Sequence, residues 1–206
     1  MSIQQQELAA ALTDVRRAFR LVYAYQRRLF DLYAEVDAVL LEKGLAFDQW
    51  GAVFNAPPPR KGTPFFRNRW AWDMLPGYAV GSFWADEKPR KGLRRRFLLQ
   101  ALADTGRTFS GAEPDPVQFE AVEESRSALR MARWTTTAGS PDWNGAWQMV
   151  SSKDWSWKGR ATVELDGATY TYEYEERDLT ELVDPAAVRA LLLDPLGRWA
   201  DDPLGG

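Results

Sequence analysis

Residues 2–44 read SIQQQELAAALTDVRRAFRLVYAYQRRLFDLYAEVDAVLLEKG, and this stretch decides the fold. Large side chains recur along it at alternating spacings of four and three residues, the heptad pattern of helices that pack on other helices. The series consists of Leu8, Leu12, Val15, Phe19, Val22, Gln26, Leu29, Tyr33, Val36 and Leu40. The pattern predicts one long helix within residues 1–44.

Residues at both ends of this stretch favour the same helix. Ser2 and Gln5 have the spacing of a capping box, and Gly44 stands where a left-handed residue would end a helix. Apolar residues also flank the stripe, and this breadth favours a seam with several helices or with a sheet over a strict two-stranded zipper. These flanking residues are Ala11, Ala18, Tyr25, Leu32 and Val39.

The apolar stripe has two interpretations. It can cover the protein's own sheet, or it can bind a second copy or another protein. Arginines crowd the first two thirds of the helix and acidic residues follow, so an antiparallel copy would place basic against acidic parts. The expected partner seam consists of Val15, Phe19, Val22, Gln26, Leu29 and Tyr33.

The chain after this helix reads as an antiparallel sheet of about five to seven strands. Alternating or apolar runs predict strands over residues 65–72, 78–84 and 93–103. The dipeptide Asp166-Gly167 predicts a type I′ hairpin that pairs Leu165 with Ala168. That register places Arg160 opposite Glu173 and Lys158 opposite Glu175, and the opposite charges support it.

Two further helices are expected, one over residues 115–133 and a short one over 185–193. The fold class is therefore α+β: a long N-terminal helix packed on an antiparallel sheet, with a second mid-chain helix and a short C-terminal one. We expect one domain in which residues 1–44 form the helix and residues 45–196 the body. Residues 197–206 should be a loosely ordered tail.

Composition limits the chemistry. The chain has no cysteine and no histidine, which excludes disulfides, thiolate nucleophiles and imidazole-based catalysis. No apolar run is long enough to span a bilayer, and the N-terminus lacks the layout of a signal peptide. We therefore expect a cytoplasmic, non-enzymatic protein without a cofactor or bound metal and without membrane partners.

Charge is unevenly distributed along the chain. Residues 45–112 carry a net charge of +6, whereas residues 113–206 carry −9. The basic part includes a predicted basic turn, and Trp70, Trp72 and Trp84 lie near its cations in sequence. Cations beside aromatic rings suit phosphates and stacked bases. The candidate polyanion-binding residues are Lys88, Arg90, Lys91, Arg94, Arg95 and Arg96. Strand alternation would send Arg95 to the face opposite Arg94 and Arg96.

Asp73, Asp86 and Lys88 form the one candidate catalytic set. Two carboxylates can hold Mg²⁺, and a lysine can help to activate a water molecule. This arrangement resembles the Asp…(Asp/Glu)-x-Lys pattern of restriction-type nucleases, which implies a magnesium-dependent nuclease as one alternative function.

Residues 134–157 contain five tryptophans. Such a cluster can fill a core or offer a platform on which a ligand stacks, and aromatic residues are more often buried. Trp143 lies in a predicted loop, residues 140–145, that contains proline, asparagine and glycine, so it is the candidate exposed ring.

The leading functional hypothesis is a binding or assembly protein that self-associates, or docks another protein, through its N-terminal helix. Nucleic-acid binding through the basic hairpin 88–96 and a magnesium-dependent nuclease are the alternatives.

Overall fold

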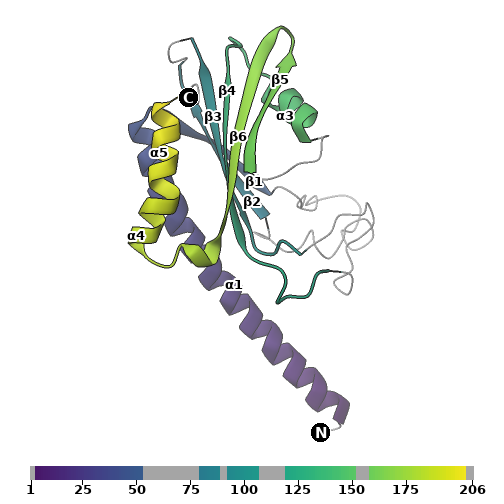
Figure 1. Cartoon of the computed structure of the whole chain (residues 1–206). Helices are drawn as coiled ribbons and strands as arrows, with labels where there is room; N and C mark the ends of the chain where they lie inside the picture. Colours follow the sequence, from purple (N-terminus) through teal and green to yellow (C-terminus); the bar gives the residue numbers. More distant parts are fainter. Residues whose placement is uncertain (1–2, 53–78, 89–91, 107–118, 152–157, 203–206) are drawn as a thin grey trace, which may run out of the picture. The chain divides into compact units, whose positions relative to one another are not determined.

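The computed structural model describes residues 3–52, 79–88, 92–106, 119–151 and 158–202 of the 206-residue chain. The chain divides into two compact units, Met1–Glu35 and Val36–Gly206. The first unit is helical, and the second contains the end of that helix, a sheet and several shorter helices (Figure 1).

Helix α1 runs without interruption from Ile3 to Glu42, which confirms the predicted N-terminal helix. Gly44, two residues after the end of the helix, has a φ of +77°, which lies in the left-handed region that glycine enters without a Cβ clash. The backbone N–H groups of Lys43 and Gly44 donate to the carbonyls of Leu40 and Leu41, each at 3.0 Å. The predicted cap at Ser2 lies outside the described residues.

The described residues form one antiparallel sheet of six strands. The strands are β1 (Leu45–Ala52), β2 (Ala79–Asp86), β3 (Arg94–Leu102), β4 (Ala128–Thr136), β5 (Lys158–Leu165) and β6 (Ala168–Asp178). Their order across the sheet is β1-β2-β3-β4-β6-β5. The predicted α+β class is therefore confirmed. Strands β2 and β3 correspond to the predictions at 78–84 and 93–103, whereas the predicted strand at 65–72 lies outside the described residues.

The hairpin of β5 and β6 has the predicted register. Leu165 pairs with Ala168, Arg160 with Glu173 and Lys158 with Glu175. Asp166 and Gly167 have φ values of +51° and +76°, the two positive values that a type I′ turn requires. This local turn chemistry was enough to position the whole hairpin.

The predicted helix at 115–133 is wrong over its described C-terminal part. Residues 128–136 instead form β4, which lies between β3 and β6, while residues 107–118 lie outside the described part. Alanine, leucine, arginine and methionine favour helices, but pairing on both edges overrides this weak preference. The mid-chain helix is α3, at Trp143–Ser151.

The C-terminal helical region is longer than predicted. After a 3₁₀ turn at Leu179–Glu181, α4 (Pro185–Val188) leads through a π-helical turn (Arg189–Leu193) into α5 (Asp194–Asp201). Pro195 lacks an N–H and stands at the start of α5, where a helix tolerates proline best. Residues 197–201 are thus helical, with Ala200 buried, although we expected a loose tail there.

Strand β3 shows how the two faces of the sheet differ. Arg95, Phe97 and Leu99 alternate with Arg96, Leu98 and Gln100, so the two sets point to opposite sides. The face of Arg95, here called the helix face, carries the C-terminal end of α1 and helix α5, whereas α3 lies on the other side (Figure 1). We call this other side the α3 face.

Polar contacts hold these helices on the helix face. Trp84, which pairs with Phe97, donates from Nε1 to Asp37 Oδ1 at 2.7 Å. Arg133, also opposite Phe97, donates to the Trp199 carbonyl at 2.7 Å. The helices contribute apolar side chains that are at most 1% exposed: Val36, Leu40, Val188, Leu192, Leu196 and Ala200.

Among the helices in the described parts of the chain, none combines the length and the hydropathy that a membrane span requires.

Candidate functional site

The first half of α1 carries a row of exposed apolar side chains. Leu8, Leu12, Val15, Phe19 and Val22 expose between 45% and 66% of their surface. We call these five residues the α1 stripe. Within the predicted seam, Val15, Phe19 and Val22 are therefore exposed, Gln26 and Tyr33 are half-buried, and Leu29 is buried.

The α1 stripe is straight and narrow. Its members occupy successive first and fourth positions of the heptad, so they lie on one side of the helix over about 21 Å. The flanking positions hold the small residues Ala9, Ala11 and Ala18, and also Arg16. Other charged residues lie farther round the helix, where Arg17 pairs with Asp14 at 3.0 Å. The side chains of the α1 stripe can make apolar contacts, but they carry no polar or ionisable group that could act in catalysis.

Arg95, a predicted polyanion-binding residue, is buried and bound to a carboxylate. Its side chain is 1% exposed and that of Asp86 is 2% exposed, and Arg95 Nη2 lies 2.5 Å from Asp86 Oδ1. The Arg95 Nε donates to both Asp86 oxygens, and its backbone N–H donates to Oδ2 at 2.8 Å. The guanidinium also donates to the carbonyls of Lys43 and Ala200. Arg95 is thus engaged in holding the fold.

Arg96 points to the α3 face, as strand alternation predicted, and is also largely buried. Its Nη2 donates to Asp48 Oδ2 at 2.9 Å, and its guanidinium carbon lies 4.3 Å from the centre of the Phe83 ring. Burial lowers the pKa of the Arg96 guanidinium, and the charge and hydrogen bond of Asp48 partly offset this. Arg96 is therefore an internal cation held by a carboxylate and an aromatic ring.

The other predicted polyanion-binding residues are described only in part. Lys88 is exposed and Arg94 is half-buried, while Arg90 and Lys91 lie outside the described residues. Of the cations in the predicted hairpin site, the structure thus leaves Lys88 and Arg94 as described candidates.

The candidate catalytic set is only partly described. Asp73 lies outside the described residues, Lys88 is exposed, and Asp86 directs both its oxygens at Arg95. No group of three or more acidic residues that could hold a metal ion occurs in the described parts of the chain. A metal at Asp86 would have to compete with a buried guanidinium.

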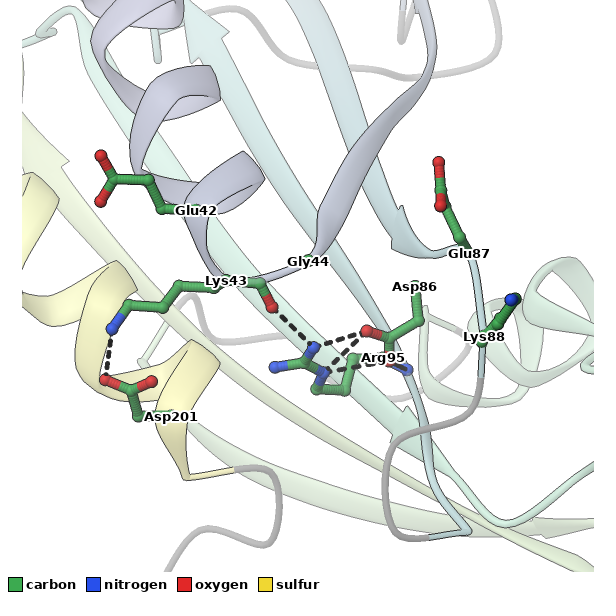
Figure 2. Close-up of a pocket in the computed structure, with 8 residues that line it drawn as sticks. All are labelled: Glu42, Lys43, Gly44, Asp86, Glu87, Lys88, Arg95 and Asp201. Atoms are coloured by element: carbon green, nitrogen blue, oxygen red, sulfur yellow. Dashed lines mark hydrogen bonds and ion pairs between the residues drawn. The ribbon is translucent and has the colours of Figure 1, made fainter.

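An open cavity of about 640 Å³ lies where the ends of α1, β2 and α5 meet the start of β3 (Figure 2). Lys43 Nζ pairs with Asp201 Oδ2 at 2.7 Å across one side, and the Asp86–Arg95 pair forms another part of the wall. Figure 2 shows no contact from Glu42, Glu87 or Lys88 to the other residues drawn. With cations and carboxylates both present, the cavity is a polar junction of four chain segments.

Trp143, the predicted stacking residue, is half-buried within an aromatic cluster on the α3 face. Its ring centre lies 6.0 Å from that of Trp134 and 5.8 Å from that of Tyr170. The backbone N–H of Asp142 donates to the Tyr170 hydroxyl at 2.9 Å, which fixes the start of α3 beside this cluster. Trp143 therefore contributes to the packing of α3.

Sequence reasoning missed how two strand arginines hold the end of α5. Arg95 donates to the Ala200 carbonyl, and Arg133 donates to the carbonyls of Trp199 and Asp202. Cations are favoured at a helix C-terminus, where unpaired carbonyls point outward. Strand alternation could have indicated that Arg95 and Phe97 share a face, but the helix that covers it lies a hundred residues later.

The model of the protein family described as PM0109 matches residues 5–198. The chain belongs to this family. No curated protein and no solved structure matches the chain. The matched region includes the whole α1 stripe, the sheet and the start of α5.

Proposed function

We propose that this protein is an assembly protein that self-associates through the α1 stripe. The observation that carries the proposal is the exposure of five large apolar side chains in one heptad row. Soluble domains seldom leave such rows uncovered, and rows of this kind mark sites of protein contact. A heptad row matches another helix better than it matches a flat surface, because its side chains fit between those of a facing helix.

The expected assembly is reversible. Burial of one such side chain contributes about 1.5–3 kcal/mol, so ten half-exposed side chains from two copies contribute about 8–15 kcal/mol. Association costs about 4–15 kcal/mol in lost freedom of motion. Because these quantities are of the same order, the assembly should dissociate on dilution.

Nucleic-acid binding through hairpin 88–96 has less support. Arg95 and Arg96 are engaged with Asp86 and Asp48, so removing them would disturb the fold whether or not they bind phosphate. A Lys88→Glu variant avoids this problem, because Lys88 is exposed. If the native protein binds DNA in a salt-sensitive way and this variant does not, the result would support nucleic-acid binding through the hairpin.

The mass of a stripe variant in solution tests the proposal. A Val15→Asp/Val22→Asp variant places two carboxylates in the seam and should be monomeric at concentrations where the native protein is not. The matched control is Ala10→Asp/Ala24→Asp, which adds the same charges to exposed positions on the opposite side of α1. The control should keep the native mass.

Size-exclusion chromatography with light scattering gives the masses, and far-ultraviolet circular dichroism checks that each variant keeps its helix. A native protein that stays monomeric at every concentration while fully folded would contradict the proposal. So would a stripe variant that assembles as well as its control.

A further inference from the structure

We propose that one flank of α1 binds the anionic surface of a lipid bilayer. The flank consists of exposed residues at alternating spacings of four and three, so they lie in one row over about 21 Å of the helix. The members of this arginine–aromatic row are Arg16, Arg20, Tyr23, Arg27 and Phe30. The proposal goes beyond self-association and does not depend on it.

The cations of the row have no carboxylate partner. Residues 15–30 contain five arginines and neither aspartate nor glutamate. In the part of the chain that the structure describes, Arg20 and Arg27 form no ion pair, and Arg16 donates to the neutral hydroxyl of Thr13 at 2.8 Å. Three guanidinium groups without a neutralising carboxylate therefore favour a partner that carries several negative charges.

The α1 stripe does not account for the two aromatic rings of the row. Tyr23 is 67% exposed and Phe30 is 59% exposed. The α1 stripe ends at Val22, and the next apolar position of its heptad, Leu29, is only 4% exposed. A second copy that covers the stripe therefore leaves Phe30 uncovered. Exposed rings beside cations favour a partner that offers apolar contact next to its negative charges.

A bilayer that contains anionic lipids offers both kinds of contact. Its phosphates lie just above the acyl chains, and basic helices with apolar side chains on an adjoining side lie along this boundary. A ring with one polar end, such as that of Tyr23, suits the level of the headgroups. We expected no membrane partner because no segment of the sequence could span a bilayer, but a helix that lies on a bilayer needs no such segment.

The shape of the row favours a bilayer over a nucleic acid. A straight row on a convex helix meets a flat surface along its whole length, so all five side chains can contact it together. Proteins that bind single strands instead line a groove with cations and stacking rings. Leu12 and Phe19, exposed members of the α1 stripe beside the row, can insert among acyl chains, whereas phosphates offer them no apolar contact.

Flotation with lipid vesicles tests the proposal on the whole protein. The native protein should float with vesicles of phosphatidylcholine and phosphatidylglycerol in equal parts, and far less with phosphatidylcholine alone. Each arginine near an anionic surface strengthens binding roughly fivefold, so Arg20→Gln/Arg27→Gln should weaken it about 30-fold. The matched control, Arg189→Gln/Arg198→Gln, removes the same charge from exposed arginines of the C-terminal helical region and should bind like the native protein.

A second variant, Tyr23→Gln/Phe30→Gln, tests the rings while every arginine stays in place, and it should also bind the anionic vesicles more weakly. Equal binding of the native protein to the two kinds of vesicle would overturn the proposal, as would an arginine variant that floats like its control. So would a protein that ignores vesicles but binds labelled single-stranded RNA through the same arginines, because the row would then be a nucleic-acid site.

Vesicle binding and self-association can fail separately. Arg20 and Arg27 lie outside the α1 stripe, so Arg20→Gln/Arg27→Gln should keep the native mass in solution while it loses vesicle binding. A native protein that floats with anionic vesicles but is monomeric at every concentration would overturn self-association and leave membrane binding intact. A native protein that self-associates but does not float would overturn membrane binding alone.

Discussion

Arg95 links parts of the chain that are far apart in sequence. From β3 it donates to Asp86 on β2, to the Lys43 carbonyl just after α1 and to the Ala200 carbonyl in α5. A buried charge is tolerated only when its partners satisfy it, and here both members of the pair are almost wholly buried. Arg95 is therefore a structural residue.

We predict that Arg95→Met lowers the free energy of unfolding by about 3–5 kcal/mol, because Asp86 would stay buried without its cation. Urea unfolding measures this loss. The control is Arg17→Met, which breaks an Arg17–Asp14 pair whose side chains are 73% and 72% exposed and should cost at most about 1 kcal/mol. Equal losses in the two variants would contradict the structural role of Arg95.

The Tyr172 hydroxyl predicts a specific dependence on pH. Burial raises the pKa of Tyr172 above its ordinary value of 10, and the nearby Tyr170 and Asp142 add to this effect. A folded-state pKa above the unfolded one gives stability that is fully present below pH 10 and is lost as pH rises beyond it. The free energy of unfolding of Tyr172→Phe should therefore fall less steeply between about pH 9 and pH 11 than that of the native protein.

The control for that experiment is Tyr23→Phe, because Tyr23 is 67% exposed and its replacement should leave the alkaline slope unchanged. Urea unfolding at each pH measures the slope. Identical slopes for native protein and Tyr172→Phe would show that the Tyr172 hydroxyl does not resist ionisation.

At the scale of elements, the sequence predicted best where the deciding contacts are local. The α1 helix was predicted from a repeat over neighbouring turns, and the β5–β6 hairpin from the turn residues Asp166 and Gly167 and the opposite charges on its two strands. Strand β4 was missed because its helix-favouring sequence becomes a strand only through pairing with β3 and β6. No local pattern carries that information.

The hairpin turn allows a matched test of this reasoning. Gly167→Ala should lower the free energy of unfolding by about 1–2 kcal/mol, because Gly167 has a φ of +76°. Gly51→Ala in β1 is the control, since Gly51 has no positive φ and a Cβ there would meet nothing within 4 Å. A loss at position 51 as large as that at position 167 would show that the turn geometry is not the cause.

The candidate sites were harder to predict than the elements. A run of basic residues is typical of an exposed surface. Arg95 and Arg96 are nevertheless buried, and each forms an ion pair with a carboxylate, of β2 and β1 respectively. Their partners lie 9 and 48 residues away and have no sequence signal of their own. The sequence likewise did not predict whether the α1 stripe is exposed, because the same heptad continues into Val36 and Leu40, which are buried.

For the molecule as a whole, the ion pairs of the described residues link charges within the basic part or within the acidic part of the chain. Within residues 45–112, Arg95 pairs with Asp86 and Arg96 with Asp48. Within residues 113–206, Arg133 pairs with Glu173 and Arg130 with Glu176. Pairing within a part leaves the net charge of that part unchanged, so our account depends on the α1 stripe, which gives a reason to expect a second copy.

The mass of the native protein as a function of concentration tests this account most directly. Sedimentation equilibrium should give a mass that rises from 23.4 kDa in dilute solution towards twice that value, and the Val15→Asp/Val22→Asp variant should stay at 23.4 kDa throughout. A native protein that remains at 23.4 kDa across the whole range, with its helix intact, would contradict assembly through the α1 stripe.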